Sequence, residues 1–117
     1  MCGYYFSNNT SLENTNNLKR RAPDEWNETS IPGLGHFGSA RLTTLGQSTK
    51  QPVVKKFGVL LFNGAVYNDL TTNDTKWIAD SLTDCMDDNI DFIRSLDGEY
   101  SLTWVTENHV LFCSDVF

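Results

Sequence analysis

Cys2 is the residue of this sequence whose position best suits a catalytic role, because it directly follows the initiator methionine. Once Met1 is removed, Cys2 carries both a thiol and a free α-amino group. An α-amino group has an unperturbed pKa of about 8, so it can act as a general base for the thiol nucleophile. The alternative is an ordinary thiol, because most buried cysteines are inert and any protein can begin with Met-Cys.

Short motifs further along the chain favour the catalytic interpretation of Cys2. In chain order they are Met1-Cys2-Gly3, Arg21-Ala22-Pro23-Asp24, Ala40-Arg41-Leu42, Gln51-Pro52, Phe62-Asn63-Gly64-Ala65-Val66-Tyr67-Asn68, Asn73-Asp74-Thr75, Leu96-Asp97-Gly98-Glu99-Tyr100-Ser101 and Ser114-Asp115-Val116-Phe117. Together they resemble the glutaminase domain of class II glutamine amidotransferases of the asparagine-synthetase type, which are N-terminal-nucleophile hydrolases. Each motif alone is a weak signal, so the resemblance rests on their order.

The resemblance implies a reaction at Cys2. The Cys2 thiolate would attack the side-chain amide of glutamine, form a γ-glutamyl thioester and release ammonia, and water would then hydrolyse the thioester. Asn63 and Gly64 would form the oxyanion hole through the Asn side-chain amide and the Gly backbone N–H. Such donors typically contribute roughly 3–4 kcal/mol each to transition-state stabilisation. Without the flanking match, Asn63-Gly64 would indicate only a turn.

The same resemblance implies two residues that bind the amino-acid end of glutamine. Arg41 would clamp the α-carboxylate, which suits the planar fork of a guanidinium. Its alternative role is a surface salt bridge. Asp74 would pair with the substrate ammonium, and its alternative role is the N-cap of a helix. Both alternatives stay open at this stage.

The sequence also departs from the family pattern. The family more often has His, Gly, His and Glu at four positions, which here are Arg20, Ala22, Ser39 and Lys76. The span from Asn63 to Asp74 is shorter than usual in the family. The resemblance further implies that the domain continues past Phe117 and that a synthetase domain follows. We therefore expect the missing strands to come from another chain or to have been lost by truncation.

Composition excludes several other classes of function. Hydrophobic residues make up 39% and charged residues 21% of the 117 residues, as in ordinary globular domains. The net charge of −6 argues against nucleic-acid binding, since the only basic cluster is Lys19-Arg20-Arg21. No apolar run approaches the roughly 18 residues of a membrane span, and no signal peptide is recognisable. Three cysteines without metal-ligand spacing suit a reducing cytoplasm. His36 and His109 are isolated, so no metal site is expected.

Hydrophobic periodicity predicts the elements that would hold these residues. We expect strands over 2–7 and 37–45 and a buried strand over 57–62 that stops at Asn63-Gly64. The stretch from Asn8 to Gly35 is expected to be a polar connection with at most a few helical turns over 12–21. A helix is predicted over 75–86, capped by Asn73 or Asp74, with Cys85 on its apolar face. A shorter helix over 90–96 and a hairpin of strands 100–105 and 110–112 follow, with Cys113 in the core.

These observations predict a single α+β domain over residues 1–117. As the resemblance implies, it would be a partial glutamine amidotransferase type 2 domain, an N-terminal-nucleophile hydrolase-like αββα sandwich incomplete at its C-terminus. It would bind glutamine without a cofactor and pass ammonia to an ATP-dependent synthetase domain or chain. One alternative is a non-catalytic glutamine-binding or assembly module of the same fold. Another is an N-terminal-cysteine amidase with a different amide substrate, against which the Arg41 and Asp74 pair argues. Homo-oligomerisation is left open.

Overall fold

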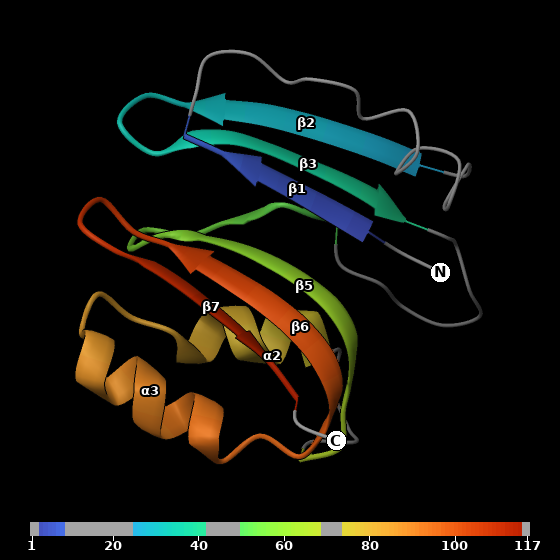
Figure 1. Ribbon diagram of the computed structural model, residues 1–117, viewed down its shortest axis with the longest axis vertical. Coiled ribbons are helices and arrows are strands. Elements are labelled where there is room, and N and C mark those ends of the chain that lie inside the picture. The colour runs from blue at the N-terminus through green and yellow to red at the C-terminus, as the bar shows by residue number, and fades with distance from the viewer. Residues whose placement is uncertain (1–2, 9–24, 42–49, 69–73, 116–117) are drawn as a thin grey trace.

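The computed structural model describes residues 3–8, 25–41, 50–68 and 74–115 (Figure 1). In chain order its elements are β1 (Gly3–Ser7), β2 (Glu25–Ile31), β3 (Gly35–Arg41), β4 (Val53–Val54), β5 (Val59–Val66), α2 (Asp74–Ser81), α3 (Met86–Arg94), β6 (Gly98–Val105) and β7 (Val110–Ser114). The helical turns predicted over 12–21 lie outside the described residues. The predicted first strand and C-terminal hairpin are confirmed, and Val105 pairs with Val110 across the hairpin.

One sheet has three antiparallel strands in the order β1-β3-β2. The expectation of a mainly irregular connection up to Gly35 was wrong, because β2 occupies 25–31 and pairs along its length with β3. The two strands are joined by a tight turn in which the Leu34 N–H donates to the Ile31 carbonyl at 3.0 Å. Pro32 and Gly33, with φ +83° at Gly33, suit the two central positions of a type II turn. The strand β2 was not predicted because most of its residues are polar.

The second sheet has four antiparallel strands in the order β4-β5-β6-β7. The predicted stop of its central strand at Asn63-Gly64 was wrong, since β5 continues to Val66. Asn63 pairs with Ser101 and Gly64 with Tyr100 in an unbroken register. Gly64 has φ +130°, and a Cβ atom there would lie 2.1 Å from the Glu99 carbonyl oxygen. Glycine therefore serves the close approach of two strands here and not a turn.

The two helices are divided at a different place from the prediction. The predicted first helix ran to Met86, but α2 ends at Ser81 and α3 begins at Met86. The side chain of Asn89, which is 1% exposed, explains the break. It accepts from the Thr83 N–H and donates to the Thr83 carbonyl, both at 2.9 Å, and so satisfies backbone groups that a continuous helix would use.

Two cysteines predicted to lie in the core have different surroundings. Cys85 is exposed at the N-cap position of α3, so that prediction was wrong. Cys113 is half-buried and packs against the hydrophobic cluster beneath the helices. The error at Cys85 follows from counting it as part of the apolar face of a helix that ends earlier.

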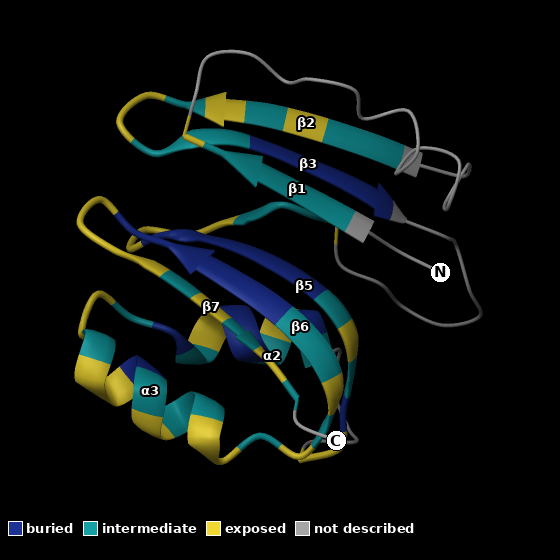
Figure 2. Ribbon diagram, in the orientation of Figure 1, coloured by how far each residue is buried: buried dark blue, intermediate teal, exposed yellow. Residues whose placement is uncertain are grey.

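The elements form three layers: the three-stranded sheet, the four-stranded sheet and the helix pair (Figure 1). Alternate residues of β5 face the two neighbouring layers. Val59 and Leu61 join Phe37 in the cluster between the sheets, while Leu60 and Phe62 join the cluster under the helices. Burial on both faces explains the continuous apolar run of β5, and Figure 2 shows β5 and β6 as the most buried strands of their sheet. The α+β class is thereby confirmed.

Candidate active site

The start of β1 and the end of β3 lie at one end of the three-stranded sheet. Gly3 pairs with Ala40, so Arg41 follows directly beside the start of β1. In Figure 1 this end lies on the same side of the molecule as the second half of β5, and β1 contacts β5. Cys2 itself lies outside the described residues, as does the side chain of Arg41. The backbone therefore brings the neighbourhoods of both predicted residues to the side where Asn63 and Gly64 lie.

Gln51 holds the outer edge of β5 just before Asn63. Its side-chain amide donates to the Phe62 carbonyl and accepts from the Phe62 N–H, both at 2.7 Å, so that it replaces a strand residue. It continues the pairing of β4 with β5, in which Val53 pairs with Leu60. The motif Gln51-Pro52 can be found in the sequence, but the sequence alone gives no sign that the Gln51 side chain bonds to the backbone of β5.

The backbone N–H of Gly64 points to this same outer edge. In an antiparallel strand, alternate residues direct their N–H and C=O groups to opposite neighbours. Phe62 bonds to Gln51 on the outer edge, and the Val66 N–H donates to Asp74 there at 3.2 Å. Gly64 lies midway between them and pairs with Tyr100 without breaking the register. Its N–H is therefore directed away from β6.

Asp74 joins the start of α2 to β5. Its Oδ2 accepts from the Val66 N–H, and its Oδ1 accepts from the Thr75 N–H at 2.8 Å. Asp74 is the first residue of α2, and its bond to the next N–H differs from the N-cap bond, which reaches an N–H two or three residues on, so these contacts do not decide between the N-cap and the ligand role. They also place the carboxylate two residues along the outer edge from Gly64. Each carboxylate oxygen can accept a further hydrogen bond, so a ligand ammonium can still be bound.

Two motifs that lie apart in the sequence are packed against each other below the candidate site. The Asn68 side chain donates to the Ser95 carbonyl at 2.7 Å and accepts from the Asp97 N–H at 2.6 Å. A Cβ atom at Gly98 would lie 2.1 Å from the Ala65 carbonyl oxygen. Asn68 and Gly98 therefore fix the end of β5 against the start of β6, and they position the site without lining it.

One cavity formed by described residues lies away from this edge of β5. This cavity of about 480 Å³ is lined by the turns around Gly33, Phe57 and Asn108, at the opposite end of the sheets from the start of β1. It contains none of the predicted site residues, so the hydrogen-bonding pattern of β5 is the better guide to the site. Within the described residues, no group of three or more His, Cys, Asp or Glu side chains is arranged to hold a metal ion. Neither described helix is long and apolar enough to cross a membrane.

Comparison with known proteins gives one informative relative. No family model matches the chain, and no solved structure matches it. An asparagine synthetase domain-containing protein of Drosophila melanogaster is 36% identical over 121 residues. The chain is similar to an asparagine-synthetase-related protein. The match covers 87% of this chain but only 22% of the relative, so the chain spans about a fifth of that protein's length.

Proposed function

We propose that this chain is the glutaminase part of a class II glutamine amidotransferase and hydrolyses glutamine to glutamate and ammonia. The order of its motifs and the name of its Drosophila relative support this. The observation that carries the proposal is the outward N–H of Gly64. It lies on β5 between the N–H of Phe62, which donates to Gln51, and the N–H of Val66, which donates to Asp74. A donor fixed in this way by a rigid strand suits the developing negative charge of an oxyanion.

In this proposal Cys2 becomes the N-terminal residue after removal of Met1. Its α-amino group takes the thiol proton, and the thiolate attacks the carboxamide carbon of glutamine. The tetrahedral intermediate collapses with cleavage of the C–N bond, and the amine leaves as ammonia after receiving that proton. Water then attacks the thioester, releasing glutamate and restoring the Cys2 thiol. No cofactor takes part.

Asn63 and Gly64 stabilise the tetrahedral oxygen in both steps. Asn63 is half-buried one residue before Gly64 on β5, and its side-chain amide supplies the second donor. Because β5 is held by Gln51 on one side and by the full length of β6 on the other, these donors need little reorganisation during the reaction.

Arg41 and Asp74 select a free amino acid in this proposal. Arg41 ends β3 beside the start of β1, where a guanidinium can bind the α-carboxylate. Asp74 on the outer edge of β5 binds the ammonium. The opposite charges of these two residues suit the zwitterion of glutamine, and the ammonia then passes to an ATP-dependent synthetase domain or chain.

Intact-protein mass spectrometry with the glutamine-analogue electrophile 6-diazo-5-oxo-norleucine tests this function. We expect loss of Met1 and one adduct that peptide mapping assigns to Cys2, with none on the exposed Cys85. The Cys2→Ala variant should take up no adduct while keeping its fold. If Met1 is retained, or if the folded protein forms no adduct, the non-catalytic glutamine-binding or assembly module becomes the better account. The departures at Ser39 and Lys76 favour that second candidate.

A further inference from the structure

The two sheets face each other across a cluster of apolar side chains (Figure 1). Four buried residues form this cluster: Phe37, Val59, Leu61 and Val105. Tyr4 and Phe6 of β1 pack against it, so both of these side chains are directed to the four-stranded sheet. Because side chains alternate along a strand, Tyr5 is directed to the opposite face of β1.

Towards the start of β1, polar side chains replace apolar ones between the sheets. On the four-stranded sheet, Leu61 of the apolar cluster lies opposite Thr103, and Asn63 follows two residues later on the same face of β5. On the three-stranded sheet, Tyr4 lies opposite Ser39. Thr103 and Ser39 are each only 4% exposed. Since a buried hydroxyl group normally has a hydrogen-bond partner, directed contacts between the sheets are expected at this end of the layer.

A side-chain hydrogen bond joins the two sheets at this polar end. The Thr103 hydroxyl donates to the phenolic oxygen of Tyr4 at 3.2 Å. Tyr4 belongs to β1 and Thr103 to β6, so the bond links one strand of each sheet. Apolar contacts are non-directional, whereas a hydrogen bond weakens steeply when its geometry is distorted. The bond therefore fixes β1 relative to β6 more precisely than the apolar cluster does.

Both ends of this bond are close to residues of the proposed reaction. In the sequence, Tyr4 comes two residues after Cys2, which lies outside the described residues. Thr103 lies opposite Leu61, two residues before Asn63 on β5. Two residues of a strand span roughly 7 Å. The bond thus joins the strand that follows the nucleophile to the strand pair that carries the oxyanion donors.

We propose that Tyr4 is a positioning residue for the reaction at Cys2 and acts through its hydrogen bond to Thr103. This inference rests on the proposed glutaminase function. The bond holds β1 at a fixed place relative to β5 and β6, and so sets the distance between the nucleophile and the oxyanion donors. A displacement of reacting groups by about 1 Å can slow a reaction roughly 100-fold. Loss of the bond therefore slows the chemical step more than it weakens binding.

The rate at which 6-diazo-5-oxo-norleucine labels Cys2 in the full chain tests this role. Tyr4→Phe removes the hydroxyl group and keeps the ring, so we expect the labelling rate at saturating reagent to fall about 10- to 100-fold. The half-saturating concentration should change little, because Tyr4 does not bind the amino-acid end of the reagent. Tyr5→Phe is the matched control, since it makes the same change on the opposite face of β1 and should leave the rate unchanged.

Variants of Thr103 show whether the hydrogen bond is the cause. Thr103→Val removes the donor and should slow labelling as much as Tyr4→Phe does. The double variant should be no slower than either single variant, because both remove the same bond. Thr103→Ser keeps a hydroxyl group and should restore most of the wild-type rate. Urea unfolding of each variant gives the conditions under which it is folded during labelling.

The outcomes separate this inference from the function on which it rests. A Tyr4→Phe protein that is less stable in urea but is labelled at the wild-type saturating rate would mean that Tyr4 acts on stability alone, and the inference would be overturned. Additive losses in the double variant would also contradict it. If Tyr4→Phe does not fold, the comparison of Thr103→Val with Thr103→Ser decides. A wild-type chain that takes up no label would overturn the glutaminase function, and this inference with it.

Discussion

Gly64 combines two constraints that no other residue type can meet. Its φ of +130° strains any residue with a side chain, and an added Cβ atom would meet the backbone of Glu99 and Tyr100. A non-glycine residue in such a conformation costs roughly 1–3 kcal/mol, and the clash would displace β5 from β6. The donor proposed for the oxyanion would move with it.

Gly64→Ala should therefore lower the free energy of unfolding by more than the strain alone and abolish labelling by the glutamine analogue. Gly33→Ala is the matched control, since Gly33 also has a positive φ but an added Cβ would meet nothing within 4 Å. Urea unfolding of both variants gives the comparison. Equal losses in the two variants would show that the close approach of the strands is unimportant.

The two described cysteines should differ in reactivity. Burial raises the pKa of the Cys113 thiol, which lowers the fraction of reactive thiolate at a given pH. Cys85 is exposed. Iodoacetamide at neutral pH should therefore modify Cys85 first and Cys113 only slowly, as followed by peptide mapping over time. Equal rates in the native protein, matching those in urea, would contradict the burial seen for Cys113.

At the scale of elements, Asn89 determines where α2 ends and α3 begins. The Thr83 carbonyl accepts from the Asn89 side chain and, at 3.1 Å, from the Trp104 indole N–H. Trp104 is fully buried in the cluster under the helices, so this junction anchors the helix pair to β6. Buried polar groups that lose a partner cost about 1–3 kcal/mol each.

Asn89→Ala should thus lower the free energy of unfolding by about 1–3 kcal/mol, mainly because the Thr83 N–H loses its partner, while the Thr83 carbonyl keeps its bond from Trp104. Asn108→Ala, in the exposed turn between β6 and β7, is the control and should change stability little. Chemical denaturation followed by tryptophan fluorescence measures both. Similar stabilities for the two variants would remove Asn89 from this role.

Sequence-based predictions succeeded where an element is determined by residues close to one another in the chain, and failed where it depends on contacts between distant residues. The buried run of β5 and the hairpin of β6 and β7 were predictable, because their patterns depend on neighbouring residues. The separation of α2 from α3 depends on the side chain of Asn89 reaching back to Thr83, which hydrophobic periodicity does not register. The strand β2 was missed because its pairing with β3, not its composition, makes it a strand.

The candidate site shows the same division. Asn63, Gly64 and Asp74 were chosen from motifs, and the structure places Gly64 and Asp74 on one edge of β5. The continuation of β5 through Asn63-Gly64 could not be read from that dipeptide, which is common in turns. The clamp by Gln51 is equally hidden, because it joins side chain to backbone across eleven positions.

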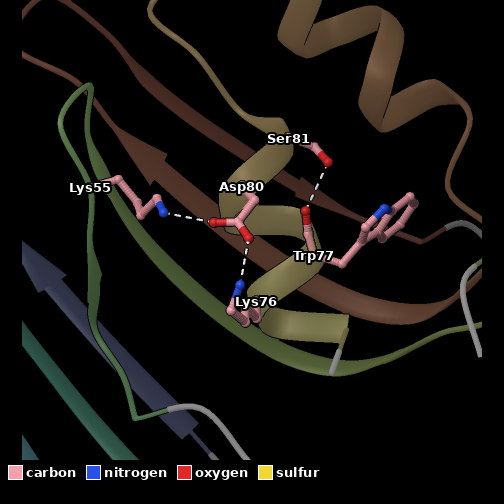
Figure 3. A network of polar contacts seen from close by, with 5 residues as sticks. All are labelled: Lys55, Lys76, Trp77, Asp80 and Ser81. Carbon is pink, nitrogen blue, oxygen red and sulfur yellow. Dashed lines mark hydrogen bonds and ion pairs between the residues drawn. The ribbon is translucent and has the colours of Figure 1, made fainter. Parts of the chain in front are cut away.

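At the scale of the whole molecule, a surface network joins the helix layer to the turn between β4 and β5. Asp80 of α2 bonds to Lys55 at 2.6 Å and to Lys76 at 2.9 Å (Figure 3). The hydrogen bond from Lys55, followed by that from Lys76, lowers the pKa of Asp80 below its ordinary value of 3.8. All three side chains are largely exposed, so solvent screening keeps the contribution to stability within about 1 kcal/mol.

The direction of the pKa shift of Asp80 determines how its contribution to stability depends on pH. A carboxyl group whose pKa is lower in the folded state stabilises the fold fully above its unfolded pKa, and this stabilisation disappears as the pH falls through the folded pKa. Asp80→Asn should therefore be slightly less stable than the wild type at neutral pH and equally stable below the lowered pKa of Asp80. Urea midpoints along a pH series, with Asp91→Asn as an exposed control on α3, measure this. Added salt at neutral pH should shrink the difference, because it screens the same exposed charges. A difference that persists in acid and in salt would instead mean that Asp80 acts through packing against the β4–β5 turn.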